Sequence, residues 1–121
     1  DFLYIVKQLG GLFAKGRLLG IQFAELFRDG LYYELARHAN GEAMRIKAAL
    51  TELGVPFQVD SPTNQQFIYL SEEQADALRT RCTYDEEWRR EGRVALRLCT
   101  SWATQPQAVD ELIAALREII R

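Results

Sequence analysis

The chain has 121 residues, of which 48% are hydrophobic and 26% are charged, as expected for one folded domain with a single core. Fifteen basic residues against seventeen acidic ones leave no positive excess, which argues against charge-driven binding to nucleic acid or to a membrane surface. Cys82 and Cys99 are the two cysteines, too few for a disulfide framework, so we expect a reducing, cytoplasmic setting.

The N-terminal part of the sequence predicts helices. The chain starts without Met and already reads as part of a helix, so we expect a piece of a longer protein. Apolar spacing then predicts a helix over 12–27, ended by Asp29-Gly30, and a longer one over 31–53, ended by Gly54. Small residues four apart on the first of these helices would let another helix approach closely; they are Gly16, Gly20 and Ala24.

The pattern changes to a period of two after Pro56. Residues 56–61 and 65–70 are expected to form two strands joined by a turn, and Ser71 to cap a short helix that ends near Arg81. A strand is expected over 93–104. An amphipathic helix follows, for which Thr104 and Gln107 have the capping-box spacing. The order predicts an α+β fold, with helices packed on a small, mostly antiparallel sheet.

Several kinds of catalytic site are absent from the sequence. A single histidine, His38, excludes a two-histidine metal site, and no cluster of cysteines or carboxylates has the spacing of metal ligands. No glycine-rich phosphate-binding loop follows a strand. Neither Cys99 nor Ser101 has a base paired with it in the sequence, so we expect no nucleophilic catalytic residue in this chain.

Arg97 is the main functional candidate. Along residues 93–104, Val94, Leu96 and Leu98 share one face of the expected strand, whereas Arg97 shares the other with the small residues Ala95 and Cys99. A guanidinium on a rigid strand is suited to bind a carboxylate through two parallel hydrogen bonds. The alternative is that Arg97 pairs with an Asp or Glu of the same chain.

Three other residues are weaker candidates. Asn64 follows Pro62-Thr63 at the start of a strand, where its amide could meet a ligand or simply close a turn. Lys15 and Arg17 bracket Gly16 near the start of a helix, where they could reach an anionic phosphate or form a solvated cationic face.

Four segments together carry a resemblance to a known family. They are KQLGGLFAKGRLLGIQF at 7–23, LARHAN at 35–40, TNQQF at 63–67 and ALRLCTSWAT at 95–104. In this order the chain resembles the C-terminal part of the pyridoxal-phosphate-dependent β-eliminating lyases and threonine aldolases, of the aspartate-aminotransferase fold type. Each segment is a weak pattern alone, and the ordered set runs across nearly the whole chain.

The resemblance implies roles for particular residues. In such enzymes an Arg on an R-x-x-T strand holds the α-carboxylate of the amino-acid substrate, and Arg97 and Thr100 match that pattern. Asn64, in the TNQQF segment, is also expected to bind the substrate. The glycine-rich helix of the family lies near the cofactor phosphate, often that of a neighbouring protomer, so Lys15 and Arg17 become candidate phosphate neighbours. Residues 1–30 would be interdomain and dimer helices, residues 31–121 the small C-terminal domain, and the protein a homo-oligomer.

The resemblance also places part of the site outside this chain. The lysine that binds the cofactor belongs to a large domain before residue 1, and Lys7, Lys15 and Lys47 do not have its strand-end setting. The parent would be a lyase or aldolase in which pyridoxal phosphate acts as electron sink, and this chain alone would be inactive. The alternative is a stand-alone α+β ligand-binding or assembly domain without catalytic activity.

Overall fold

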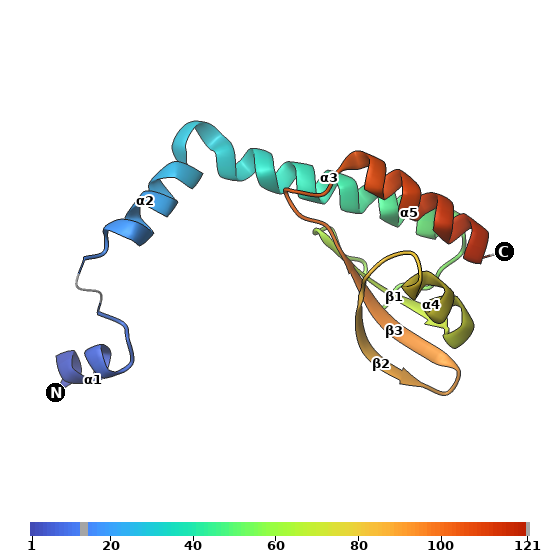
Figure 1. Ribbon diagram of the computed structural model, residues 1–121, viewed down its shortest axis with the longest axis horizontal. Helices are drawn as coiled ribbons and strands as arrows, with labels where there is room; N and C mark the ends of the chain where they lie inside the picture. Colours follow the sequence, from blue (N-terminus) through green and yellow to red (C-terminus); the bar gives the residue numbers. More distant parts are fainter. Residues whose placement is uncertain (13–14, 121) are drawn as a thin grey trace. The chain divides into compact units, whose positions relative to one another are not determined.

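The computed structural model describes residues 1–12 and 15–120. Backbone contacts divide the chain into two units, Asp1–Glu34 and Leu35–Arg121. The second unit has the predicted α+β fold, with helices on a three-stranded antiparallel sheet (Figure 1). No helix of the described residues is long and apolar enough to cross a membrane.

The first unit consists of short helices with exposed side chains. α1 covers Phe2–Gln8 and α2 covers Arg17–Leu26, and neither contains a buried residue. The helix predicted over 12–27 therefore begins at Arg17, with Gly16 at its N-cap; residues 13 and 14 of that prediction lie outside the described part. The predicted stop is confirmed, because the left-handed φ values of Asp29 (52°) and Gly30 (80°) interrupt the helical backbone there.

The long helix α3, Leu31–Glu52, ends at the predicted glycine. Gly54 has a φ of 70°, and the amide of Val55 donates to the carbonyl of Leu50 at 3.0 Å. This is a Schellman C-terminal cap, in which a left-handed residue turns the chain back on the last helical turn. Val55 and Leu50 both join the hydrophobic core, so the cap also fixes where the following loop begins.

The sheet has the order β1-β3-β2, with β3 in the centre. β1 covers Gln65–Ser71, β2 covers Asp85–Arg90 and β3 covers Arg93–Cys99, and both pairings are antiparallel. The strand predicted over 56–61 is reduced to an isolated bridge between Phe57 and Ile68. The predicted last strand stops at Cys99, although the amide of Thr100 still donates to the carbonyl of Asn64 at 3.0 Å.

β2 is a strand that the sequence pattern did not predict. Its residues DEEWRR are almost all charged, and only Trp88 is half-buried. A charged edge strand is typical of sheets that avoid pairing with other chains. The turn that joins β2 to β3 has left-handed φ values at Glu91 (53°) and Gly92 (75°), as a tight hairpin requires.

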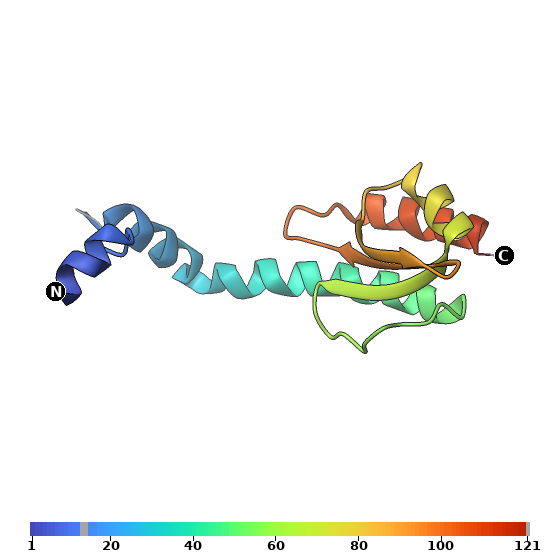
Figure 2. The same cartoon turned by 90° about the horizontal axis from the view of Figure 1, so that it is seen from below.

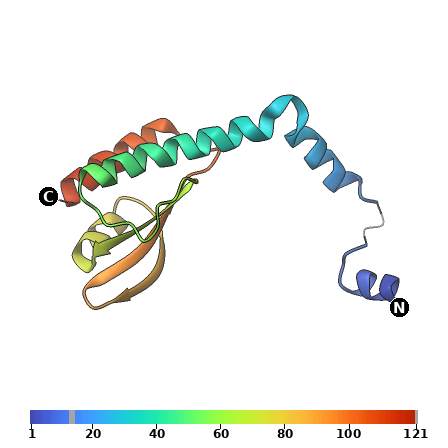
Figure 3. The ribbon, with the colours of Figure 1, turned by 180° about the vertical axis from the view of Figure 1, so that it is seen from behind.

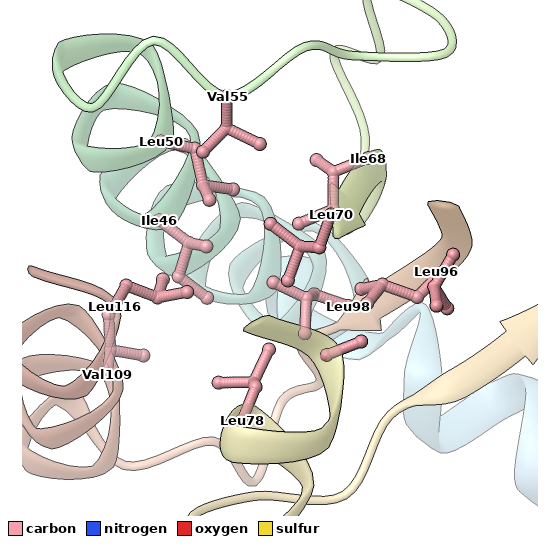
Figure 4. Close-up of a cluster of buried hydrophobic side chains, with 12 residues drawn as sticks. Ile46, Leu50, Val55, Ile68, Leu70, Leu78, Leu96, Leu98, Val109 and Leu116 are labelled. Atoms are coloured by element: carbon pink, nitrogen blue, oxygen red, sulfur yellow. The ribbon is translucent and has the colours of Figure 1, made fainter. Parts of the chain in front are cut away.

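Three helices cover one face of the sheet. α3 and α5, Pro106–Ile119, lie side by side over it (Figures 1 and 3), and α4, Glu72–Arg79, lies next to α5 (Figure 2). The core between helices and sheet is formed by twelve buried residues (Figure 4): Ile46, Leu50, Val55, Ile68, Leu70, Ala75, Leu78, Val94, Leu96, Leu98, Val109 and Leu116. The apolar face predicted for residues 94–98 is therefore confirmed as a core face.

The predicted helix caps have different outcomes. At α4 the prediction is confirmed and extended: the Ser71 hydroxyl accepts from the amide of Gln74, whose side chain accepts from the amide of Ser71. At α5 the predicted capping box is wrong. The N-cap is Gln105, without a side-chain bond, and the Thr104 hydroxyl accepts from the amide of Ser101 instead, because the loop before α5 makes its own turn.

Candidate functional site

Arg97 lies on the sheet face that points away from the helices. The neighbouring residues Leu96 and Leu98 are buried in the core, and alternation places Arg97 on the opposite side. On this outer face Ala95 is fully buried, and the rings of Tyr69 and Trp88, which face it from the two neighbouring strands, have centroids 5.7 Å apart. The two rings therefore cover Ala95, so the space expected beside Arg97 does not extend along the strand toward Ala95.

The guanidinium of Arg97 is held from both neighbouring strands. Asp85 is its cross-strand partner on β2, and one oxygen, Oδ2, accepts from Nη2 at 2.6 Å and from Nε at 3.2 Å. Gln65 on β1 accepts weakly from Nη1 at 3.4 Å. A guanidinium has five N–H donors, so these three bonds leave one donor on each terminal nitrogen.

A shallow pocket of 220 Å³ adjoins this group. It is lined by Thr83, Tyr84, Asp85, Arg97 and Cys99, and its volume is several times the ~30 Å³ that one water molecule takes in the liquid. The Asp85 carboxylate raises the pKa of Arg97, chiefly through the hydrogen bond, so the guanidinium stays cationic. The pocket therefore offers a fixed positive group with unused donors, next to one carboxylate.

The thiol of Cys99 in the same pocket is not an activated nucleophile. Desolvation raises its pKa, and the opposing effect of the Arg97 cation is smaller. Burial also raises the pKa of Cys82. The thiolate is the reactive form of cysteine, so neither residue is poised for covalent chemistry. Among the described residues no group of three or more His, Cys, Asp and Glu side chains could hold a metal ion.

Thr100 and Asn64 lie at the end of the strand that carries Arg97, but their polar atoms bond within the chain. The Thr100 hydroxyl is buried and donates to the carbonyl of Ala39 at 2.7 Å. The Asn64 amide nitrogen donates to the carbonyl of Thr100 at 2.7 Å. These bonds join β1, α3 and the end of β3, so the two residues fix the backbone that follows Arg97.

The predicted phosphate neighbours lie in the other unit. Lys15 precedes Gly16, Arg17 is the first residue of α2, and both side chains are exposed. Lys47, by contrast, is an internal ion-pair partner of Asp60 and donates to the carbonyl of Ser61 at 2.9 Å. A cavity of 470 Å³, lined by residues of α5 and by Arg81 and Cys82, which follow α4, contains none of the predicted site residues.

The sequence did not identify Asp85 and Gln65 as the two side chains that hold Arg97. The alternation of residues along 93–99 shows which face Arg97 occupies, but a cross-strand partner is known only when the strand register is known. One sequence signal could have revealed Asp85. Only Glu91-Gly92 separates DEEWRR from RVALRLC, and a two-residue connection of this kind is typical of a β-hairpin.

One solved structure gives this fold a family. The second unit defines a class, a small α+β domain with helices on one face of a short antiparallel sheet. Threonine aldolase of Leishmania major has this fold over 98% of our chain, with 35% sequence identity and a TM-score of 0.90. By this match the chain is a threonine aldolase-like domain.

The match covers only part of the larger protein. This chain spans 35% of the length of the Leishmania threonine aldolase chain. No protein-family model and no curated protein matches the sequence. The resemblance inferred from the four sequence segments is confirmed at the level of the domain, as is the aldolase-type C-terminal fold.

Proposed function

We propose that this chain is the substrate-carboxylate-binding and dimer-supporting C-terminal domain of a pyridoxal-phosphate-dependent amino-acid aldolase or lyase. The observation that carries the proposal is the 35% identity and TM-score of 0.90 to a threonine aldolase over nearly the whole chain. Arg97 supports it independently, as a strand-borne cation with unused donors beside a pocket. Its substrate is a β-hydroxy or related α-amino acid, and the cellular setting a reducing cytoplasm.

In this proposal Arg97 binds the α-carboxylate of the substrate through the donors that remain on Nη1 and Nη2. Two terminal N–H groups match the two oxygens of a carboxylate, and such bidentate pairs fix orientation as well as position. Thr100 and Asn64 support Arg97 indirectly. Their hydrogen bonds join the end of β3 to the start of β1 and to α3. These bonds hold the strand that carries Arg97 in a fixed position.

The described residues do not form a complete site for pyridoxal phosphate. That cofactor needs a lysine in a pocket and a partner for its ring nitrogen. Lys47 is engaged by Asp60, and Lys7 and Lys15 are exposed on the first unit. We therefore propose that other polypeptide supplies the lysine, that Lys15 and Arg17 approach the phosphate, and that this chain alone is inactive.

The dimer-supporting role rests on the exposed apolar side chains of the first unit. Leu18, Ile21 and Phe23 on α2 are 77%, 52% and 62% exposed. Added side-chain atoms at Gly20, on the same helix, would meet open space in the single chain. Apolar surface of this extent is characteristic of interaction sites, and a homo-oligomeric parent would cover it with a second copy.

Cofactor binding tests the proposal directly. After mixing with pyridoxal phosphate and dialysis, the 121-residue chain should retain no visible absorbance band. A longer protein that contains this chain together with the preceding domain should retain one. A stoichiometric absorbance band on the 121-residue chain that disappears in Lys47→Ala would refute the proposal that other polypeptide supplies the cofactor lysine. The alternative, a stand-alone binding domain, is favoured by the Arg97–Asp85 pair and predicts no activity in either protein.

A further inference from the structure

We propose that Asp85 is a specificity-determining residue that restricts the Arg97 pocket to ligands with a single carboxylate. The inference rests on the proposed function of Arg97 as a carboxylate-binding residue. It extends that function, because nothing in the resemblance or in the comparison with threonine aldolase assigns a role to the strand that carries Asp85.

The position of Asp85 is fixed by the sheet. It lies directly opposite Arg97 in the register of β2 and β3, and the 2.6 Å bond joins the two side chains on the outer face. Both residues line the same 220 Å³ pocket. Any ligand that uses the free donors of Nη1 and Nη2 therefore lies beside the Asp85 carboxylate. The group on the other flank, the Gln65 amide, is neutral.

The charges of the pocket favour one carboxylate and disfavour two. Arg97 and Asp85 are the only charged residues among the five that line it, and Cys99 is a neutral thiol because desolvation raises its pKa. The first carboxylate of a ligand is attracted by Arg97. A second carboxylate is repelled by Asp85 and finds no second cation among these lining residues. Glu87 adds further negative potential at the guanidinium.

The size of the effect follows from Coulomb's law. Two unit negative charges about 5 Å apart in water repel enough to weaken binding about fourfold, and salt screening reduces this to about twofold. Asp85 is 63% exposed at its side chain, so the water value is the appropriate one. Removal of its charge should therefore change the preference between one and two carboxylates by about two- to fourfold.

The experiment compares two amino acids that differ by one carboxylate. In aspartate a carboxylate replaces the terminal methyl group of 2-aminobutyrate. Each is titrated into the isotopically labelled chain at low, constant ionic strength, and the Nε–Hε resonance of Arg97, assigned by its loss in Arg97→Lys, reports binding. The wild-type chain should bind 2-aminobutyrate more tightly than aspartate, and Asp85→Asn should narrow that ratio by about two- to fourfold.

Asp76 provides a matched control. It pairs with Arg89 at 2.7 Å and is 64% exposed, close to the values for Asp85, but it belongs to α4 on the helix side of the sheet. Asp76→Asn should leave the ratio unchanged, and Asp85→Glu, which keeps the charge, should preserve the wild-type value. Asp85→Ser replaces Asp85→Asn if the latter does not fold.

The outcomes separate the two proposals. If both ligands shift the Arg97 resonance but the ratio is the same in wild type, Asp85→Asn and Asp85→Ser, the role of Asp85 is wrong while Arg97 still binds carboxylates. An equal change in Asp76→Asn also contradicts the inference, because the effect would then come from net charge. If neither ligand shifts the resonance in any variant, the carboxylate-binding function of Arg97 is itself wrong.

Discussion

The hydroxyl group of Thr100 donates a hydrogen bond of 2.7 Å to the carbonyl oxygen of Ala39, and so connects the end of β3 to the middle of α3. Ala39 is in the part of α3 that belongs to the second unit, and both residues are buried. A helical carbonyl normally accepts from the amide four residues further along, so the Thr100 hydroxyl is an additional donor. The contact fixes the distance between the helix layer and the strand that carries Arg97.

Thr100→Val should destabilise the domain. Valine has nearly the shape of threonine, so the substitution removes the hydrogen bond without creating a large cavity, and the carbonyl of Ala39 loses a buried partner. Because the carbonyl of Ala39 keeps its helical amide donor, the expected cost is the net contribution of one hydrogen bond, about 0.5–1.5 kcal/mol. Equilibrium unfolding in urea should show this loss as a lower midpoint with an unchanged slope.

Thr80→Val is the matched control for that experiment. The Thr80 hydroxyl also donates to a backbone carbonyl, that of Ala77, at 2.8 Å, but the position is exposed. Water can replace this bond, so the free energy of unfolding should change by less than about 0.5 kcal/mol. Equal losses in the two variants would contradict the structural role that we assign to Thr100.

The sequence predicted the elements whose pattern is local. Gly54 ends α3 because that cap needs a left-handed backbone conformation, which glycine adopts readily. Ser71 caps α4 because its hydroxyl accepts a hydrogen bond from the amide three residues further along. β2 escaped prediction because its exposure on both faces removes the alternation that marks a strand. The strand predicted over 56–61 fails for a different reason: its alternation is local, but only Phe57 forms a bridge with β1.

The candidate site was predictable only in part. Alternation was enough to place Arg97 opposite the core, but Asp85 and Gln65 come from strands whose register the sequence does not define. Of the two interpretations that the sequence left open, the internal pair is present, because Arg97 pairs with Asp85; the ligand site stays a proposal, supported by the donors of Arg97 that remain unused. Thr100 and Asn64 were selected by pattern, and the bonds they make reach the backbone rather than the pocket.

Ser71→Ala should weaken the N-terminus of α4. The substitution removes the hydroxyl that accepts from the amide of Gln74 at 3.1 Å. Loss of such a cap costs about 1 kcal/mol, which thermal or urea unfolding can measure. Gln105→Ala at the N-cap of α5 is the control, because Gln105 makes no capping bond and its replacement should cost much less. A larger loss at Gln105 would contradict the assignment of the two caps.

The reactivity of Cys99 should depend on Arg97. The Arg97 cation lowers the pKa of the Cys99 thiol against the larger, opposite effect of desolvation. Removing the cation in Arg97→Gln should therefore raise that pKa further and reduce the thiolate fraction at about pH 8. Alkylation by iodoacetamide, measured in a Cys82→Ser background, should slow about two- to fourfold at that pH.

The difference in alkylation rate should disappear when the pH is raised well above the pKa, because Cys99 is then fully ionised in both proteins. Arg90→Gln is the control, since Arg90 lies at the opposite end of the β2–β3 hairpin, over the ring of Trp88. An Arg97→Gln protein that reacts faster than wild type at about pH 8 would show that the sign of the electrostatic effect is wrong.

Arg97→Ala should raise the KM for an amino-acid substrate in the longer protein to which we assign this chain. In the proposed role the guanidinium binds the carboxylate in the ground state as well as in the transition state, so its loss should act first on KM, by at least about tenfold, with a smaller fall in kcat. Arg93→Ala is the control: Arg93 projects from the same face of β3, but it stacks on Tyr69 near the hairpin turn. That variant should keep KM within about twofold of the wild-type value, because Arg93 lies outside the pocket that adjoins Arg97. Unchanged KM and kcat in Arg97→Ala would exclude Arg97 from substrate binding and leave its pair with Asp85 as a purely structural contact.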